Sequence, residues 1–574
     1  MVTTSTNRWR KIEGTAPWLL PLLLAFPVGV GLLGAALPAF GYMPALGGTT
    51  LSLAPWRALL AEPGLGVSIA LGVAAGLVTT LLSVAGTALF LAAAYGTRFF
   101  RLGRHLLAPL IAVPHAAAAF GLALLIAPSG LLFRAAALLL GFDRPPDLLI
   151  VGDPLGLTMI AGLIVKEMPF LLLVALAALP QADPERRLQL ARSLGYGRIA
   201  GFLLTVWPGV YRQIRLPVIA VAAFASSVVD VALILGPSTP APLAVRLVAW
   251  MNDPDLTRRF EASAGALLQL GVTLAVILVW LGGERFAAIA RQRMSEAGRR
   301  LARDAMARPV AALPAALAGL AVLGGLFILA AWSFAGFWAF LDLAPRAWTV
   351  GGWARVLGPA AGPLRTAFTV ALAAACLALV LVVLMLEGRR TSAPGGDQSR
   401  LPAITTALLY LPLIVPQVAF VFGLQVLILA AGLTPSLPLL VAVHLIFVAP
   451  YVALALADPW FALDPRYERV ASSLGRSRLA ALWRVRLPML AAPILSAFAI
   501  GFAVSVGQYL PTVLIGAGRL PTITTEAVAL AAGGNRRVIG VYALLQTLLP
   551  FLAFALAAAV PRLLWRGRRG IRPA

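Results

Sequence analysis

Cysteine and histidine are scarce in this chain of 574 residues. A single cysteine, Cys376, excludes an intrachain disulfide and a metal site built from several cysteines. The three histidines, His105, His115 and His444, are not spaced as metal ligands, and the sequence contains no Gly-x-Ser-x-Gly element. We therefore expect neither a catalytic residue nor a metal site in this chain.

Lysine occurs only twice, and this decides whether the chain binds nucleotide phosphates through a P-loop. Such a loop needs a lysine followed by serine or threonine, because the ammonium group contacts the phosphates and the hydroxyl contacts the metal ion. Lys11 is followed by Ile12, and Lys166 is followed by Glu167. Any ATP hydrolysis linked to this protein must therefore take place on another subunit, and we expect no cofactor here.

Charged residues are also few, at 12% of the chain, whereas hydrophobic residues make up 60%. Such a chain has too few polar side chains to cover soluble domains of this length. Apolar runs of about 20 residues recur, long enough to cross a hydrocarbon core of about 30 Å as helices. We predict an all-α polytopic membrane protein with about twelve transmembrane helices. Their centres are Leu23, Leu81, Val113, Leu171, Ala225, Leu270, Leu320, Leu377, Leu413, Leu445, Ala499 and Phe551.

The net charge of +24 would suggest a nucleic-acid partner in a soluble protein. Here, however, the basic residues collect in alternate loops of the predicted span pattern, including 285–308 and 562–569. If the amino terminus lies inside, these loops all fall on the inner side, as the positive-inside rule requires. We therefore expect both termini in the cytoplasm and no nucleic-acid partner. The opposite loops still contain Arg246, Arg258, Arg259, Arg536 and Arg537.

A polar, arginine-rich sequence occurs twice, about 280 residues apart. We call residues 183–208 the first polar loop and residues 464–488 the second polar loop. Each begins with Asp-Pro, contains an Ala-x-Ser-Leu-Gly core and ends at a proline. A shorter Phe-Gly-Leu sequence is also duplicated, at 120–122 and 422–424. The chain is therefore expected to contain two related halves.

Each half is predicted to hold six spans, with its polar loop between the fourth and fifth. Because six spans return the chain to its starting side, the halves form two parallel six-helix repeats related by an axis along the membrane normal. We place the first half at 1–281 and the second at 310–574. The arginine-rich segment 282–309 is predicted to be a solvated cytoplasmic linker.

Both polar loops are predicted to contain a short helix that ends at a glycine turn. No proline or glycine interrupts 185–194 or 467–474, and the apolar residues fall at helical spacing. Gly195 and Gly475 then stand where helices commonly end in a left-handed residue, and a second short helix follows. Such a helix either lies on lipid headgroups or docks a partner. Its occurrence at equivalent positions in both halves favours docking, because a pseudo-twofold surface suits a twofold partner.

The polar loops resemble the cytoplasmic EAA loop of the permeases of binding-protein-dependent ABC importers. In that family an Ala-x-x-Leu-Gly core and a later Leu-Pro frame the coupling helix that fits a groove of the ATPase. The resemblance covers nearly the whole chain and is strongest to fused permeases of the iron(III), thiamine and polyamine group. It implies the type I importer permease fold in the bacterial inner membrane. Its implied partners are a homodimeric cytoplasmic ATPase, which binds ATP and Mg, and an extracytoplasmic solute-binding protein.

The resemblance also implies which residues dock the ATPase. The family's usual glutamate is replaced by Gln189 in the first polar loop and by Arg469 in the second, and Trp207 replaces a leucine. The expected ATPase-docking residues are Glu185, Gln189, Ala191, Leu194, Gly195, Pro208, Glu468, Arg469, Ala471, Leu474, Gly475 and Pro488.

Charged residues inside predicted spans are costly and mark functional surfaces. Lys166 and Glu167 lie near the middle of the fourth span, with Asp230 in the fifth as the candidate partner of Lys166. We favour a structural lock over a solute pathway for these three residues. His115, Gln417 and Gln508 are further candidates for lining a pathway. Pro114 and Pro416 are expected to kink the third and ninth spans and to free backbone carbonyls.

The sequence is therefore interpreted as the permease subunit of an ATP-driven importer of a small solute. The alternative is a twelve-span secondary transporter driven by an ion gradient, for which Lys166, Glu167 and Asp230 would supply titratable groups. The position of the polar loops between the fourth and fifth spans favours the permease. Importers of this kind place most of their selectivity in the binding protein, so iron(III), thiamine, a polyamine and other small solutes stay open.

Overall fold

The computed structural model describes residues 3–298, 300–392 and 402–564. Within these residues the chain is almost entirely helical, and the only β-structure is two isolated bridges. Nine of the described helices are long and apolar enough to cross a membrane. Two further helix pairs, bent by 84° and 75°, raise the number of candidate spans to eleven. The prediction of an all-α polytopic membrane protein is therefore confirmed.

The described helices of the first half include two short ones, α8 and α9, inside the first polar loop. They are α1 (Thr3–Ala39), α2 (Ala54–Ala61), α3 (Leu65–Ala94), α4 (Arg98–Ala112), α5 (His115–Ile126), α6 (Leu131–Leu140), α7 (Leu157–Ala178), α8 (Pro184–Ser193), α9 (Arg198–Gly201), α10 (Trp207–Ser226), α11 (Asp230–Leu235), α12 (Leu243–Met251) and α13 (Arg258–Glu296).

The described helices of the second half repeat much of this order. They are α14 (Ala307–Phe334), α15 (Gly351–Ser392), α16 (Ala403–Ile414), α17 (Gln417–Ala430), α18 (Leu437–Ala462), α19 (Arg466–Ser473), α20 (Arg478–Ala481), α21 (Leu487–Met489), α22 (Ala491–Gly507), α23 (Leu510–Gly516), α24 (Ile523–Ala529) and α25 (Arg536–Leu564). Short 3-10 or π segments η1 to η5 join some of them.

One of the twelve predicted spans is not among the candidates found in the described residues. The span predicted around Ala225 is α10, whose first turns carry Arg212 and Arg215 and so lower its hydropathy. Its counterpart in the second half is one of the two bent pairs, Arg478–Met489 with Ala491–Gly507. Arginine near the polar loop therefore keeps the hydropathy of α10 below that of the other candidate spans.

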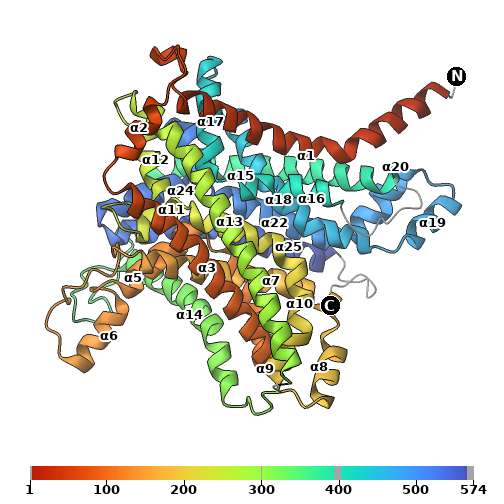
Figure 1. The fold of residues 1–574 in the computed structure, drawn as a ribbon, viewed down its shortest axis with the longest axis horizontal. Coiled ribbons are helices and arrows are strands. Elements are labelled where there is room, and N and C mark those ends of the chain that lie inside the picture. Colours follow the sequence, from red (N-terminus) through yellow and green to blue (C-terminus); the bar gives the residue numbers. More distant parts are fainter. Residues whose placement is uncertain (1–2, 299, 393–401, 565–574) are drawn as a thin grey trace.

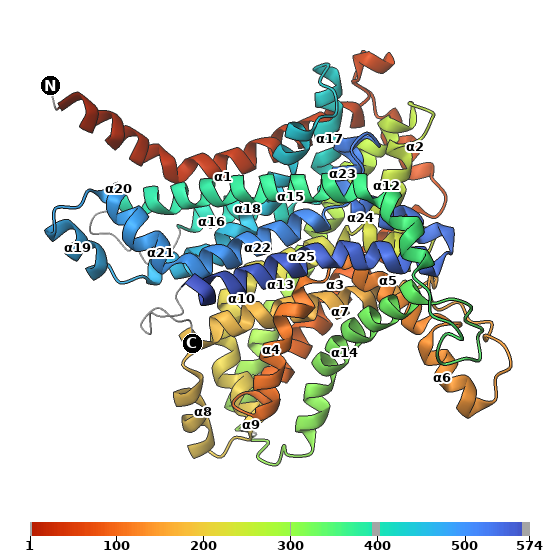
Figure 2. The ribbon, with the colours of Figure 1, turned by 180° about the vertical axis from the view of Figure 1, so that it is seen from behind.

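The first helix of each half packs against helices of the other half. α1 packs most extensively against α17 and α15, whereas α14 packs against α5 and α3. In Figure 1 the red α1 accordingly lies across the cyan helices, and the green α14 lies beside the orange ones. Figure 2 shows the same exchange from behind. The two halves are thus clasped together.

Glycines allow these exchanged helices to approach closely. A Cβ added to Gly121 of α5 would lie 2.7 Å from the Cα of Gly325 in α14. A Cβ on Gly423 of α17 would lie 1.8 Å from the carbonyl oxygen of Gly31 in α1. Small residues at such crossings let helix backbones pack directly in a membrane. The duplicated Phe-Gly-Leu sequences therefore mark the two clasping contacts.

Four helices break inside the membrane region. α4 ends before Pro114 and α16 ends before Pro416, as the sequence predicts, because proline lacks the N–H that continues a helix. α10 and α11 are separated at 227–229, and α22 and α23 are separated at 508–509. Discontinuous helices of this kind expose backbone groups and side chains near the middle of transporters. These breaks set the position of the polar residues described below.

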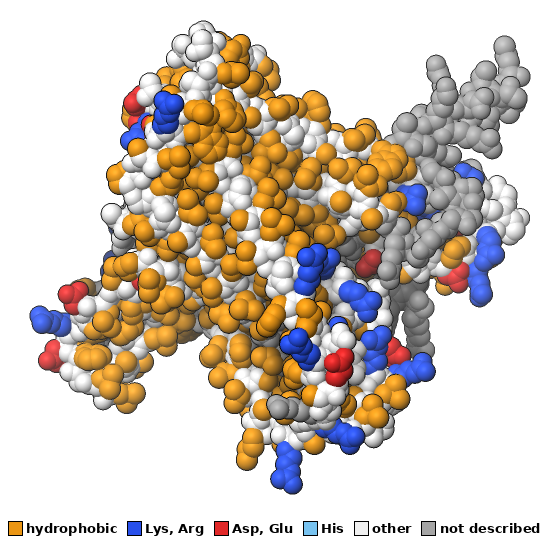
Figure 3. All heavy atoms as spheres, in the orientation of Figure 1, with side chains coloured by type: hydrophobic (Ala, Val, Ile, Leu, Met, Phe, Trp, Pro, Cys, Tyr) orange, Lys and Arg blue, Asp and Glu red, His pale blue; other side chains and the backbone are white. Residues whose placement is uncertain are grey.

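Both polar loops lie at one end of the molecule, where α1 begins and α25 ends (Figures 1 and 2). In Figure 3 hydrophobic side chains cover most of the visible surface, and blue Lys and Arg side chains gather near this end. The arrangement agrees with the charge distribution predicted from the sequence.

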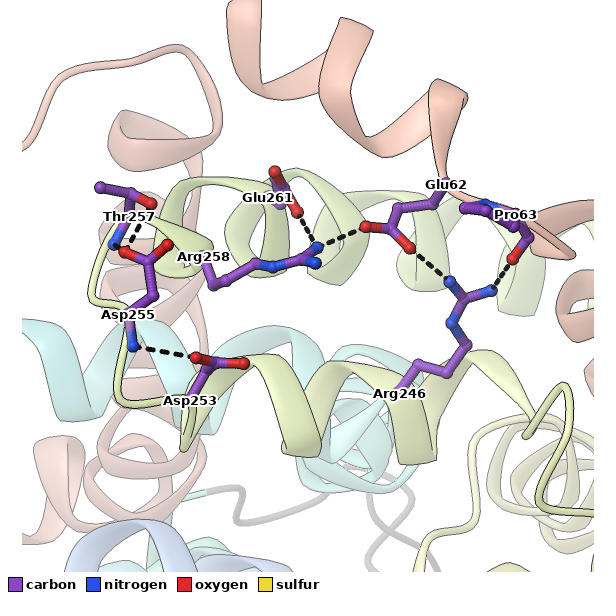
Figure 4. Close-up of polar contacts among 8 residues, drawn as sticks. All are labelled: Glu62, Pro63, Arg246, Asp253, Asp255, Thr257, Arg258 and Glu261. Carbon is purple, nitrogen blue, oxygen red and sulfur yellow. Dashed lines mark hydrogen bonds and ion pairs between the residues drawn. The ribbon is translucent and has the colours of Figure 1, made fainter.

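Arginines at the opposite end are held by local partners. Arg246 Nη2 lies 2.7 Å from Glu62 Oε2, and Arg258 pairs both with Glu62 and, at 2.7 Å, with Glu261 (Figure 4). Arg536 donates to Ser129, and Arg537 donates to the carbonyl of Gly336. These exceptions to the charge bias therefore tie α2, α12, α13 and the neighbouring loops together.

Candidate functional site

Each polar loop begins with the predicted helix and ends it at the predicted glycine. α8 and α19 occupy equivalent positions, and Gly195 and Gly475 follow them with φ of 83° and 73°. The N–H of Tyr196 donates to the carbonyl of Ala191, and the N–H of Arg476 donates to that of Ala471, both at 3.0 Å. This hydrogen bond closes a helix end through a left-handed residue, so the two turns are the same structure.

The second helix of each polar loop leads directly into a span. α9 continues through a π-helical turn, Phe202–Val206, into α10, and α20 continues through Leu482–Arg486 into α21. Pro208 and Pro488 stand in the first turns that follow. The sequence predicted the short helices but not the π turns, which depend on packing rather than on composition.

Large apolar residues are exposed where α8 and α19 end, as a docking surface requires. Leu194 is 60% exposed and Leu474 is 74% exposed, although both are large and hydrophobic. Gln189 and Arg469 are also exposed, at equivalent positions. Two other predicted docking residues of the first polar loop differ in exposure, because Glu185 is exposed whereas Ala191 is buried.

The alanines of the two cores lie inside their loops. Ala191 is 2% exposed and Ala471 is 6% exposed. A Cβ on Gly201 would lie 3.0 Å from that of Ala191, which shows how tightly α8 packs on α9. These alanines therefore shape the loops, and the neighbouring leucines form the exposed surface.

Glu468 in the second polar loop is bound to arginines of the chain itself. Its carboxylate pairs with Arg390 of α15 and, at 2.6 Å, with Arg486. Arg486 is 1% exposed and also lies 2.6 Å from Glu387 Oε2, with its guanidinium 5.1 Å from the ring centre of Trp460. This ionic network fixes the second loop to the end of α15.

The first polar loop replaces this network by apolar packing. Leu188 and Val206, 280 residues before Glu468 and Arg486, are both buried in one hydrophobic cluster with Leu179. The network could not be inferred from the repeat, because its partners Glu387 and Arg390 lie outside the second polar loop.

The linker is more than the solvated connector predicted from its charge. α13 continues to Glu296, and Asp304, beyond it, is only 8% exposed. One carboxylate oxygen of Asp304 accepts the N–H of Ile199 at 2.6 Å. The linker therefore packs on the first polar loop.

Lys166 does not pair with Asp230 in the described structure, contrary to the prediction. Its ammonium group donates to the carbonyls of Leu110 at 3.1 Å and Ile111 at 2.9 Å, at the end of α4. Leu110 is four residues before Pro114, which has no N–H to donate to that carbonyl. Lys166 thus satisfies the carbonyls that the predicted kink sets free.

Glu167 and Asp230 belong to a separate polar cluster. Glu167 Oε1 lies 3.0 Å from Nε2 of His115, the first residue of α5. Asp230, at the start of α11, is within electrostatic range of both. Tyr451 of α18 is within electrostatic range of Glu167, and Tyr509 is within electrostatic range of Asp230. The cluster therefore joins residues of both halves.

The two tyrosines were not identified from the sequence. Tyr451 follows Pro450 as Phe170 follows Pro169 in the first half, so the added hydroxyl of Tyr451 was the available signal. Gln417 and Gln508, predicted to line a pathway, are half-buried at the breaks of the ninth and eleventh spans.

His444 forms hydrogen bonds on both sides of the break between α22 and α23. Its Nδ1 lies 2.8 Å from the hydroxyl of Ser505 in α22, and its Nε2 lies 3.0 Å from that of Thr512 in α23. His444 is 1% exposed and therefore not a pathway group. Buried hydrogen bonds of this kind fix a discontinuous helix.

Comparison with known proteins assigns the family. The chain is 32% identical over 532 residues to the inner membrane ABC transporter permease protein YnjC of Escherichia coli (strain K12), covering 91% of this chain and 93% of that protein. The chain belongs to the ABC transporter permeases. No protein-family model matches the sequence. The permease is thus a polytopic membrane subunit of an ABC transporter, in place of the secondary transporter considered as the alternative.

Proposed function

We propose that this permease forms the translocation pathway of an ATP-driven importer in the bacterial inner membrane. An extracytoplasmic binding protein delivers the solute, and a homodimeric ATPase, which binds ATP and Mg, docks on the two polar loops in the cytoplasm. Both termini lie on the cytoplasmic side. The observation that carries the proposal is the pair of equivalent loops, each presenting exposed leucines at the same end of the molecule.

The loops are connected to the polar cluster by continuous helical structure. α9 leads through its π turn into α10, whose end at Ser226 comes just before the break and Asp230. In the second half α21 and α22 lead to the break next to Tyr509. Closure of the ATPase dimer moves the loops together and so changes the position of both broken helices. The cavity switches from inward-facing to outward-facing by this mechanical coupling.

The polar cluster is the proposed site of the solute between the two halves. It contains two carboxylates, of Glu167 and Asp230, and the imidazole of His115. This composition favours a cationic solute over an anionic one. Iron(III), thiamine and a polyamine, the solutes suggested by the sequence resemblance, remain the candidates.

The test is reconstitution of the permease in liposomes with and without an ATPase and a binding protein of the same organism. We expect solute uptake that needs both partners, and ligand that co-purifies with the binding protein will identify the solute. Replacing the exposed leucines in Leu194→Asp/Leu474→Asp should abolish co-purification of the ATPase. Uptake by the permease alone, or undiminished co-purification of the double variant, would contradict the proposal.

A further inference from the structure

The second helices of the two polar loops begin differently. In the second loop the N-terminus of α20 is capped locally, because the hydroxyl of Ser477 accepts the N–H of Ala480 at 3.3 Å. In the first loop the residue 280 positions earlier is Gly197, which has no side chain to cap α9. Helix N-termini leave backbone N–H groups without partners inside the helix. The start of α9 therefore needs a partner from elsewhere.

That partner is Asp304 of the linker. Its Oδ2 accepts the N–H of Ile199 at 2.6 Å, and its Oδ1 accepts the Nε and Nη2 of Arg308, on α14, at 3.0 and 2.8 Å. The N–H of Gly197 donates to the carbonyl of Arg300 at 3.2 Å. The linker thus contacts the first turn of α9 through both its backbone and a side chain.

The surface of the first loop is shaped to admit the linker. A Cβ on Gly197 would lie 2.3 Å from the carbonyl oxygen of Leu301 and 2.9 Å from Oδ2 of Asp304. Leu301 itself has a φ of 43°, a left-handed conformation that residues other than glycine rarely adopt. Gly197 leaves room for the linker, and Leu301 adopts an unusual backbone conformation where the linker meets Gly197. The two surfaces are therefore complementary in shape.

We infer that Asp304 and residues 300–308, which we call the linker clamp, position the first polar loop and join it to α14 of the second half. The inference rests on the proposed docking of the ATPase to the polar loops. The second loop has no such clamp among the described residues, and the Glu468–Arg486 network holds it to α15 instead. The two loops are therefore fixed to different elements.

The clamp gives the first loop a second mechanical connection. α10 carries its motion to the break at 227–229, while Asp304 and Arg308 carry it to α14. α14 packs against α5, whose first residue is His115 of the polar cluster. Movement of the first loop thus reaches the polar cluster from two sides.

The experiment compares Asp304→Ala with its matched control, Ser477→Ala, in the full chain. We expect Asp304→Ala to speed amide hydrogen exchange in 197–201 by about tenfold, the effect of losing a helix cap. Ser477→Ala should do the same only in 477–481. Asp304→Asn keeps one acceptor oxygen, so it should fall between wild type and Asp304→Ala. Unchanged exchange in 197–201 in Asp304→Ala would overturn the inference.

A double variant separates the clamp from a simple helix cap. Gly197→Ser in the Asp304→Ala background supplies a local cap of the kind that Ser477 provides, so exchange in 197–201 should return toward wild type. Its Cβ, which would fall 2.3 Å from the carbonyl oxygen of Leu301, at the same time keeps the linker off α9. We expect solute-stimulated ATPase activity of the reconstituted transporter to stay reduced, because α9 is still not joined to α14. Full recovery of that activity would show that Asp304 is only a cap.

The same measurements distinguish this inference from the proposed function. If the wild-type permease does not bind the ATPase, the proposed function fails whatever the exchange data show. If the wild type binds the ATPase and couples normally, and Asp304→Ala leaves both exchange and activity unchanged, only the clamp fails.

Discussion

The ammonium group of Lys166 donates a hydrogen bond to the carbonyl oxygen of Leu110 at 3.1 Å. This bond occurs where Pro114 ends α4 and leaves that carbonyl without its helical donor. A lysine inside a span therefore completes a broken helix. Lys166 therefore has structural partners other than Asp230, and its role as part of a lock stays a prediction.

Lys166→Met should lower the amount of folded permease in the membrane. The variant leaves the carbonyls of Leu110 and Ile111 buried without a donor, at about 1–3 kcal/mol each. Fluorescence-detected size exclusion and thermal unfolding in detergent will measure the loss. Lys166→Arg keeps a donor and serves as the control. Normal assembly of Lys166→Met with abolished transport would instead assign Lys166 to the pathway.

Glu468→Leu should destabilise the second polar loop, because Arg486 is buried and would keep only Glu387 as an acidic partner. Removing one partner of a buried pair typically costs about 3–5 kcal/mol, and the exposure of Glu468 places the expected loss at or below the lower limit. Glu468→Leu/Arg486→Val installs the apolar pair of the first loop and should recover part of the loss. A double-mutant cycle on thermal stability measures the coupling. Additive effects would show that the pair does not act as a unit.

Gly195→Pro/Gly475→Pro should leave the permease inserted but uncoupled from its ATPase. Proline holds φ near −65°, whereas these turns need φ of 83° and 73°. Co-purification with the ATPase and solute uptake are the measurements. Gly432→Pro, at another left-handed glycine with φ of 69° outside the polar loops, is the matched control and should keep coupling. Undiminished uptake by the double variant argues against docking at the glycine turns.

Gly423→Ala should disrupt the close contact between α1 of the first half and α17 of the second half. Its Cβ would fall 1.8 Å from the carbonyl oxygen of Gly31, so α1 and α17 must move apart. Gly271→Ala, in α13 with no atom within 4 Å of the added Cβ, should instead be neutral or stabilising by up to about 1 kcal/mol, because alanine favours helix. Yield and thermal stability of the two variants are compared. Equal stability would contradict the direct backbone contact.

Stability of the linker clamp should depend on pH only in acid. Burial of Asp304 would raise the pKa of its carboxyl, but hydrogen bonds from Ile199 and Arg308 together lower it below its usual value. A carboxyl with a lowered folded-state pKa stabilises above its unfolded pKa and loses this effect as pH falls. Protection of 197–201, corrected for intrinsic exchange, should stay constant from neutral pH to about pH 5 and fall below about pH 4. Loss of protection near neutral pH would point to another group.

Several features were determined by local sequence. The apolar runs specify spans because a helix satisfies its own backbone, and the Leu-Gly cores specify turns because Gly195 and Gly475 adopt a left-handed φ at no steric cost. Pro114 and Pro416 specify helix breaks because proline has no N–H to continue the helix. The resemblance of the repeated polar loops to the EAA loop indicated the permease class, which the relative from Escherichia coli then confirmed.

Other features depended on which helices meet. The repeat did not predict that Lys166 would bind the end of α4, that Glu167 would pair with His115, or that Asp304 would cap α9 from outside the loop. Each contact joins residues far apart in the chain through helix crossings and the exchange of α1 and α14. Periodicity determines which face of a helix is apolar, whereas the crossings determine what that face contacts. The sequence by itself thus decided the class, the spans and the turns, and only the tertiary structure decided the partners of the buried charges.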